Sequence, residues 1–156
     1  MASLEIDSIV IHCSATKVTA DISAHDIDTW HRANGWYRNK QNIRDDPEHY
    51  TSIGYHWFVS KDGTLFPCRV ENETGCHCAG WNSRAIGICY AGGLDANGKE
   101  ADTRTPQQKH AIRQLIREIL QRHPGKVRQI LGHRDTGAKK ACPCFEAIPE
   151  YLDLLK

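Results

Sequence analysis

Short apolar runs constrain the fold of this chain more than any other feature of its sequence. Residues 9–11 are β-branched throughout and are bounded by polar residues, which is typical of a strand buried on both faces. Residues 86–90 and 127–131 predict two further buried strands. A sheet buried on both faces must be covered by helices, so these runs favour an α/β domain.

Two well-capped helices lie between the predicted strands. Ser23 is an N-cap for a helix over residues 24–34 that Gly35 would end. Thr105, Pro106 and Gln108 form a capping box with proline at the first helical position. The helix that follows, ending before Gly125, is expected to bury Ile112, Leu115, Ile116, Ile119 and Leu120.

Weaker signals complete the predicted domain. Residues 54–59 and 64–66 flank Lys61-Asp62-Gly63, and an Asp-Gly pair between β-rich runs predicts a hairpin. A short helix is expected over residues 149–155. Together these elements predict an α/β fold with a central mixed β-sheet flanked by helices, in a single domain spanning residues 1–156.

Composition excludes several classes of protein. A length of 156 residues fits one domain, and 20 Lys+Arg against 19 Asp+Glu give a net charge of +1. Mean hydropathy is −0.56 and no apolar stretch approaches the roughly 18 residues of a spanning helix, so membrane insertion is not expected. The N-terminal seven residues carry acids where a signal peptide carries Lys or Arg, which predicts a chain that is cytoplasmic as synthesised. In that compartment the seven cysteines are expected to be reduced.

Charge is unevenly distributed along the chain. Residues 103–140 hold ten Lys/Arg and two acids, a net charge of +8. Such a segment suits an anionic polymer or a phosphate-rich partner, but it equally fits an ordinary solvated helix surface.

Two histidines follow buried strands directly. His12 comes after residues 9–11, and His133 comes two residues after Leu131. Strand ends of α/β sheets bring side chains from distant parts of a sequence together, and Cys142 lies nine residues beyond His133. His, His and Cys are suitable ligands for one Zn²⁺, and three protein ligands leave a fourth position for water, as in catalytic zinc sites. Hydrolysis of an amide is the natural use of such a site.

The segments around these residues resemble a known family, the zinc-dependent N-acetylmuramoyl-L-alanine amidases. That group comprises the bacteriophage lysozyme-type amidases and the peptidoglycan recognition proteins. The resemblance covers residues 6–155. It rests on, in order, Ile9-Val10-Ile11-His12-Cys13-Ser14-Ala15-Thr16, Trp30-His31 followed by Trp36, Gly54-Tyr55-His56-Trp57-Phe58-Val59, Asp62-Gly63-Thr64, Gly80-Trp81-Asn82, Ile86-Gly87-Ile88, Gly132-His133-Arg134-Asp135 and Ala141-Cys142-Pro143.

The resemblance implies roles for particular residues. It makes His12, His133 and Cys142 the ligands of one zinc ion, in agreement with the set reached above. It implies that Tyr55 hydrogen-bonds or transfers a proton beside the metal and that Lys140 stabilises the oxyanion formed when the amide carbonyl is attacked. Lys139 is adjacent to Lys140 and is an alternative for that role. Substrate-binding candidates are His77, Trp81, Asn82 and Arg84, because an aromatic face packs on a sugar and Arg grips a carboxylate.

Four features depart from the family pattern or stay open. Cys144 stands where Gly or Ser is usual, and Ala85 where Ser is usual. Residues 37–53 form an added polar segment that is either a wall of the substrate groove or a surface insertion. Cys76-His77-Cys78 looks chelating, but no second pair accompanies it, and a second metal is not predicted. His31 and His56 are expected to be structural, and Cys13, Cys68 and Cys89 to be small core residues.

The leading hypothesis is therefore a peptidoglycan hydrolase that cleaves the lactyl–L-alanine amide bond between glycan and stem peptide. Without a signal peptide, a phage or prophage endolysin that acts on the cell wall once released is the expected setting. A cytoplasmic amidase that recycles soluble muropeptides is the alternative enzyme. A non-catalytic peptidoglycan-binding module is a further alternative, although such modules commonly lack the cysteine ligand. Nucleic acid is not expected as a partner, RNA polymerase binding is compatible with the charge but is not predicted, and a monomer is expected.

Overall fold

A mixed five-stranded sheet forms the centre of the protein, seen here in a computed structural model that describes residues 5–156. The strand order is β4-β3-β5-β1-β7. The central strands are parallel, and only β4 at one edge is antiparallel to its neighbour. The strands of this sheet are β1 (Ser8–Cys13), β3 (Trp57–Val59), β4 (Leu65–Pro67), β5 (Ala85–Tyr90) and β7 (Gln129–Gly132). The expected α/β fold with a central mixed sheet is confirmed.

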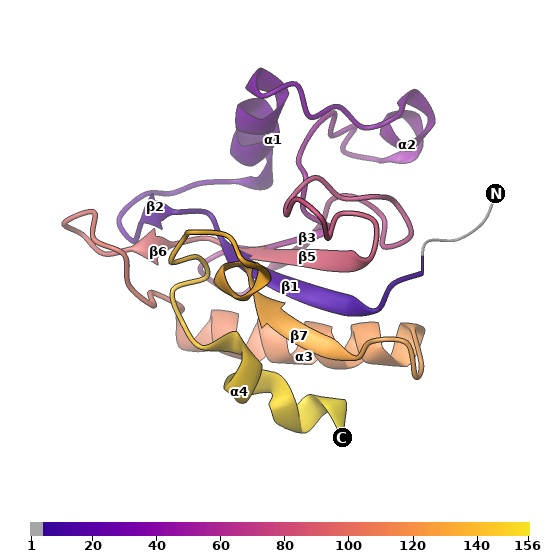
Figure 1. The fold of residues 1–156 in the computed structure, drawn as a ribbon. Coiled ribbons are helices and arrows are strands. Elements are labelled where there is room, and N and C mark those ends of the chain that lie inside the picture. Colours follow the sequence, from indigo (N-terminus) through magenta and orange to yellow (C-terminus); the bar gives the residue numbers. More distant parts are fainter. Residues whose placement is uncertain (1–4) are drawn as a thin grey trace.

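Helices cover both faces of the sheet (Figure 1). Helix α1 (Ala24–Ala33) and the short α2 (Lys40–Asp45) lie on one side, and α3 (Pro106–Arg122) and α4 (Ala147–Tyr151) lie on the other. A 3₁₀ turn, Leu152–Leu155, continues α4. The predicted capping box at Thr105 is present, and the predicted N-cap Ser23 also forms a capping box, with Asp26.

The core has two layers, one on each face of the sheet. Alternate residues of β1 and β5, such as Ile9 and Ile86, pack against Ile112 and Ile116 of α3. On the other face Phe58 and Cys89 pack against Ile27 of α1. This two-sided burial explains why the central strands read as continuous apolar runs.

The boundaries differ from the predicted ones in a few places. The first hairpin strand, β3, is shorter than the predicted residues 54–59, because residues 54–56 form an approach segment before it. Leu120 is only partly buried, unlike the other four predicted core positions of α3. The last helix begins at Ala147, two residues before Pro149. Three short elements were not predicted: α2, and the two-stranded ladder of β2 (Thr16–Lys17) with β6 (Gly93–Leu94).

The structure bears on two expectations from composition, the absence of a membrane-spanning helix and the state of the cysteines. Within 5–156 no helix has the length and apolar character needed to cross a bilayer. All seven cysteines lie in this part of the chain and are free thiols, and Cys13, Cys68 and Cys89 are buried as predicted. The expectation of no signal peptide was based on residues 1–7, and residues 1–4 of that segment lie outside the described residues.

Candidate metal centre

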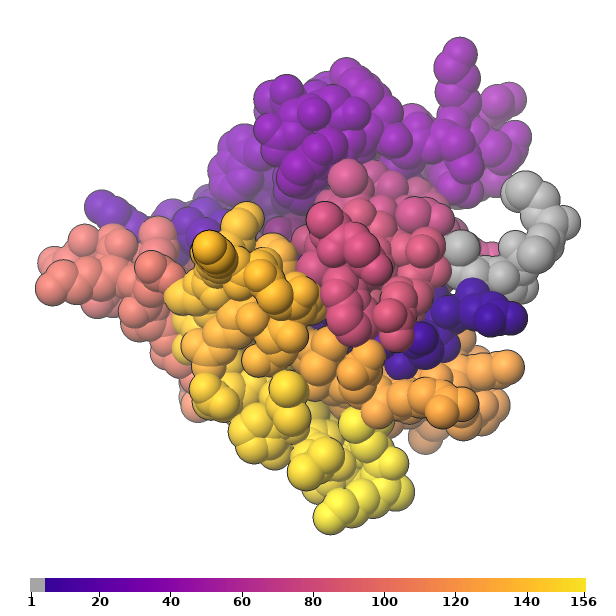
Figure 2. Space-filling model, in the orientation of Figure 1, coloured from indigo at the N-terminus to yellow at the C-terminus, as the bar shows by residue number. Residues whose placement is uncertain are grey.

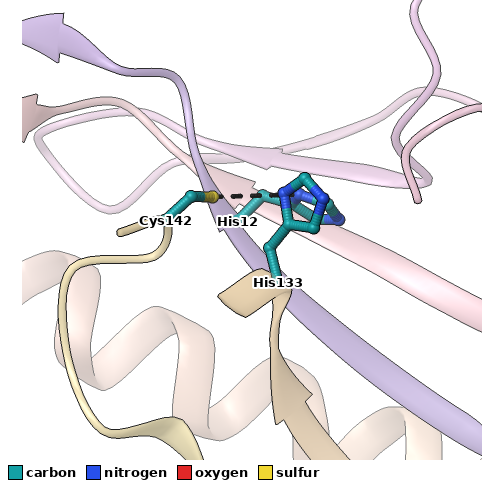
Figure 3. Close-up of side chains that lie close together, drawn as sticks. All are labelled: His12, His133 and Cys142. Atoms are coloured by element: carbon teal, nitrogen blue, oxygen red, sulfur yellow. Dashed lines mark hydrogen bonds between the residues drawn. The ribbon is translucent and has the colours of Figure 1, made fainter. Parts of the chain in front are cut away.

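Three side chains from separate parts of the sequence meet at the carboxyl ends of β1 and β7. His12 is the fifth residue of β1, and His133 follows β7 directly as the first residue of the 3₁₀ turn His133–Thr136. Because Ile11 pairs with Gly132, the two histidines occupy the next position on adjacent parallel strands. Cys142 approaches from a loop that returns over this edge, as Figure 3 shows. One ligand atom from each residue lies within 4.8 Å of the others.

Backbone contacts fix the loop that carries Cys142. The amide of Arg134 donates to the carbonyl of Cys142 over 2.8 Å, and the amide of Cys13 donates to its sulfur over 3.2 Å. Gly132 lets the loop approach closely, since a Cβ at this position would lie 2.6 Å from Cδ of Pro143. These contacts hold the Cys142 sulfur on the side of the loop that faces His12.

A tight turn fixes His133 in the same way. A carboxylate oxygen of Asp135 accepts the amide of Gly132 over 2.8 Å, and the hydroxyl of Thr136 donates to the carbonyl of His133 over 2.6 Å. The Gly-His-Arg-Asp sequence thus carries its own turn, with the glycine at the strand end and the acid as its cap.

The donor set fits one zinc ion. His12 is 1% exposed, and burial holds its pKa well below the ordinary value; burial also lowers the pKa of His133. Both imidazoles are therefore neutral near pH 7, the form that donates a lone pair. His12 Nδ1 lies 3.9 Å from Cys142 Sγ, and tetrahedral zinc needs ligand atoms about 3.3–3.7 Å apart, so small side-chain rotations close the site. Among residues 5–156 no other group of three His, Cys, Asp or Glu side chains converges in this way.

Tyr55 lies beside the histidines and is held by helix α1. Its ring centroid is 5.1 Å from that of His12 and 5.4 Å from that of His31. His31 Nδ1 accepts the amide of Gly54 over 2.8 Å, so α1 fixes the residue immediately before Tyr55. Burial raises the pKa of Tyr55 well above its usual value, so the phenol keeps its proton and can donate a hydrogen bond.

A pocket of about 600 Å³ opens next to the cluster; because His133 lines it, we call it the main pocket. Two loops form its sides, residues 76–82 and residues 133–140, and they lie side by side on the face shown in Figure 2, in pink and in orange. Its lining consists of Trp36, Cys76, His77, Cys78, Ala79, Asn82, His133, Thr136, Gly137, Ala138 and Lys140. Lys140 also lines a second pocket, which borders Cys142, whereas Lys139 lines only that second one.

The predicted substrate-binding residues divide into two groups. His77 and Asn82 line the main pocket, and Asn82 Oδ1 accepts the amides of residues 77 and 78. Trp81 and Arg84 lie outside its lining; Arg84 stacks 4.4 Å from the Trp81 ring and pairs with Asp7. A substrate role for these two residues stays a prediction.

Buried charges support the site in ways that the sequence analysis missed. Asp28 of α1 accepts amides from residues 51, 52 and 53, just before Tyr55. Arg38 and Glu73 form a buried pair that ties residues 37–53 to the loop before Cys76. Arg69 donates to four backbone carbonyls in the same region. No residue of 37–53 lines the main pocket, which argues against a groove wall. The segment is not a simple surface insertion either, because Tyr50 and Ile53 are buried in the core.

The predicted structural histidines have structural partners. His56 is fully buried between the carbonyl of Glu73 and the amide of Gly87, and His31 holds Gly54. Both interpretations are confirmed.

Comparison with known proteins decides the family. Residues 2–145 match the family described as N-acetylmuramoyl-L-alanine amidase. The chain belongs to this amidase family. The amidase is 36% identical to the endolysin of Klebsiella phage KP32 over 142 residues, which are 91% of this chain and 83% of that protein. It is 34% identical to the endolysin of Escherichia phage T7 over 140 residues, 90% of this chain and 82% of that one.

Solved structures agree with this assignment. The amidase superposes on N-acetylmuramoyl-L-alanine amidase LysC from Clostridium intestinale with a TM-score of 0.71 at 26% identity, covering 96% of this chain and 84% of LysC. It shares its fold with the bumblebee peptidoglycan recognition protein SA, at a TM-score of 0.68 and 21% identity over 96% of this chain and 82% of that one. The resemblance found in the sequence is therefore confirmed.

Proposed function

We propose that this peptidoglycan amidase depends on one zinc ion held by His12, His133 and Cys142. The observation that carries the proposal is the convergence of two neutral imidazoles and one thiol at the carboxyl end of the sheet. The set is soft enough for zinc and leaves room for a fourth ligand. When bound, the ion supplies a Lewis acid that polarises an amide carbonyl and lowers the pKa of water toward ~7.

The residues around the cluster bind and stabilise the reacting groups. The Tyr55 phenol, protonated near pH 7, donates a hydrogen bond toward the reacting centre. The Lys140 ammonium lies on the rim that the main pocket shares with the second pocket, and it offsets negative charge on the amide oxygen as the carbonyl is attacked. The bond broken is the amide between the lactyl group of N-acetylmuramic acid and L-alanine, and the proton of the attacking water ends on the alanine nitrogen.

The setting that we propose is a phage-type endolysin acting on the cell wall. Relatives that are named endolysins match more than four fifths of their length to this chain, which supports a whole-enzyme likeness. The main pocket lies between two surface loops, where an enzyme that acts on a polymer needs its binding site. Trp36 on its rim presents an exposed aromatic face for a sugar ring.

The test compares two substrates at equal concentrations of lactyl–alanine bonds. Purified sacculi and soluble anhydro-muropeptides are each incubated with the zinc-loaded protein, and products are identified by mass spectrometry. An endolysin releases stem peptides from sacculi at least as fast as from the soluble substrate. Cleavage confined to soluble muropeptides would make the chain a recycling amidase, and binding to sacculi without cleavage of either would make it a recognition module.

A further inference from the structure

The imidazole of His77 uses both of its nitrogens inside the protein. His77 Nδ1 lies 2.9 Å from His12 Nε2, and His77 Nε2 lies 3.3 Å from the carbonyl oxygen of Ala85. The two histidine rings meet edge to face, with centroids 5.0 Å apart. Neither nitrogen of His77 is left to contact a substrate, although its ring borders the main pocket.

The protein holds the His77 ring in place from several sides. A Cβ on Gly87 would lie 2.8 Å from the ring, and one on Gly75 would lie 2.5 Å from it, so two glycines provide the slot that the ring fills. The Asn82 side chain accepts the amide of His77 over 2.7 Å and fixes its backbone. The glycine between Ile86 and Ile88 therefore serves a packing need of His77.

The partners of the two rings determine where their protons lie. A carbonyl oxygen only accepts hydrogen bonds, so the proton of His77 must be on Nε2, facing Ala85. In a neutral imidazole with its proton on Nε2, Nδ1 carries the lone pair and accepts a hydrogen bond. His12 must then donate from Nε2, and its own lone pair is on Nδ1. That is the atom 3.9 Å from Cys142 Sγ.

We propose that His77 is a positioning residue that holds His12 as the Nε2–H tautomer and aims His12 Nδ1 at the metal. Metal-binding histidines commonly donate their second N–H to a carboxylate, a carbonyl or water; here a second neutral histidine accepts it. The inference rests on the proposed zinc site. The family resemblance suggested that His77 contacts substrate; the inference instead gives His77 a contact with the metal-binding residue His12.

Two substitutions separate hydrogen bonding from packing. His77→Phe keeps a ring in the slot but removes the acceptor, and His77→Asn gives up the ring but places an amide oxygen close to the former Nδ1. Zinc affinity is measured by competition with a chromophoric chelator, without any hydrolysis assay. We expect His77→Phe to lose about 10–100-fold in affinity and His77→Asn to recover most of that loss. His110→Phe, on the exposed face of α3, is the matched control and should bind zinc like the unaltered protein.

The proposal is overturned if His77→Phe binds zinc as tightly as the unaltered protein, or if His77→Asn binds zinc no more tightly than His77→Phe.

A measurement on the unaltered protein covers the case in which His77→Phe does not fold. Long-range ¹H–¹⁵N spectra of the imidazoles should place the His12 proton on Nε2, with zinc and also after chelation, because His77 fixes it in both states. A proton on Nδ1 in the metal-free protein contradicts the inference, while normal zinc binding without hydrolysis contradicts only the proposed function.

Discussion

Two cysteines near the metal centre, only two residues apart, have different surroundings. The sulfur of Cys142 accepts the amide of Cys13 and faces His12. The sulfur of Cys144 donates to the carbonyl of Gly93 over 3.4 Å and is not part of the converging set. A residue pattern of Cys-Pro-Cys does not distinguish the ligand from its neighbour, but the hydrogen bonds do.

Cys142→Ser should therefore abolish tight zinc binding, whereas Cys144→Ser should leave it unchanged. The hydroxyl of serine is a poor zinc ligand near neutral pH, since it does not ionise as a thiol does. Zinc content after dialysis, measured by atomic emission, is the readout, with circular dichroism as a check on folding. Equal zinc content in the two variants would refute the ligand assignment.

The adjacent lysines give a second matched pair. Lys140 lines the main pocket with His133 and Lys139 does not, so only Lys140 is placed to meet charge that develops there. Lys140→Ala should lower kcat by about 10²–10³-fold, the usual cost of one oxyanion donor, with zinc content unchanged. Lys139→Ala should stay close to the unaltered enzyme. The reverse order of the two effects would assign the role to Lys139.

At the scale of elements, helix α1 acts as the support for the approach to β3. Its Asp28 is 3% exposed and binds the amides of residues 51–53, and its His31 binds the next one, at Gly54. These contacts hold Tyr55 against His12 although Tyr55 is outside any strand. Sequence patterns predicted α1 correctly but gave no sign of this role, because a buried aspartate on a helix looks like any other polar position until its partners are known.

Asp28→Asn should destabilise the protein by about 1–3 kcal/mol, since an amide cannot satisfy three N–H donors as a carboxylate does. Activity should fall beyond what the loss of folded protein explains, because Tyr55 loses its support. Urea unfolding and kcat are measured in parallel, with the exposed Asp21→Asn as the control. Unchanged stability would show that the carboxylate is not needed there.

At the scale of the whole molecule, the sequence predicted the layers of the fold and the convergence of His12, His133 and Cys142, but not the buried ion pairs. Period and capping signals are local, so the long strands and both long helices could be found from them. Two-residue strands such as β2 carry no period, and the Arg38–Glu73 pair joins residues 35 positions apart. The basic segment, residues 103–140, carries less unpaired positive charge in the folded protein than its sequence suggests. Four of its ten cations pair with acids, namely Arg104, Arg113, Arg122 and Arg134.

Buried neutral histidines make the metal-free protein sensitive to acid. Burial lowers the pKa of His31 and of His56 to about 4 and that of His77 to about 3, against 6.5 for an exposed histidine. Between pH 6.5 and 4 the unfolded chain binds protons that the folded one does not, so stability falls as pH falls, by up to about 1.4 kcal/mol per pH unit for each group. Urea unfolding of chelator-treated protein at pH 7.5, 6.0 and 5.0 tests this. A constant free energy of unfolding over that range would be inconsistent with neutral buried rings.

The most direct test of the central claim is the release of new amino termini from purified peptidoglycan. Zinc-loaded protein and a chelator-treated sample are incubated with the same substrate, and the termini are labelled and identified. The account predicts new alanine termini in the zinc sample alone, restored to the chelated sample by added zinc. Termini of any other residue, new reducing sugar ends, or release that is indifferent to chelation would contradict it.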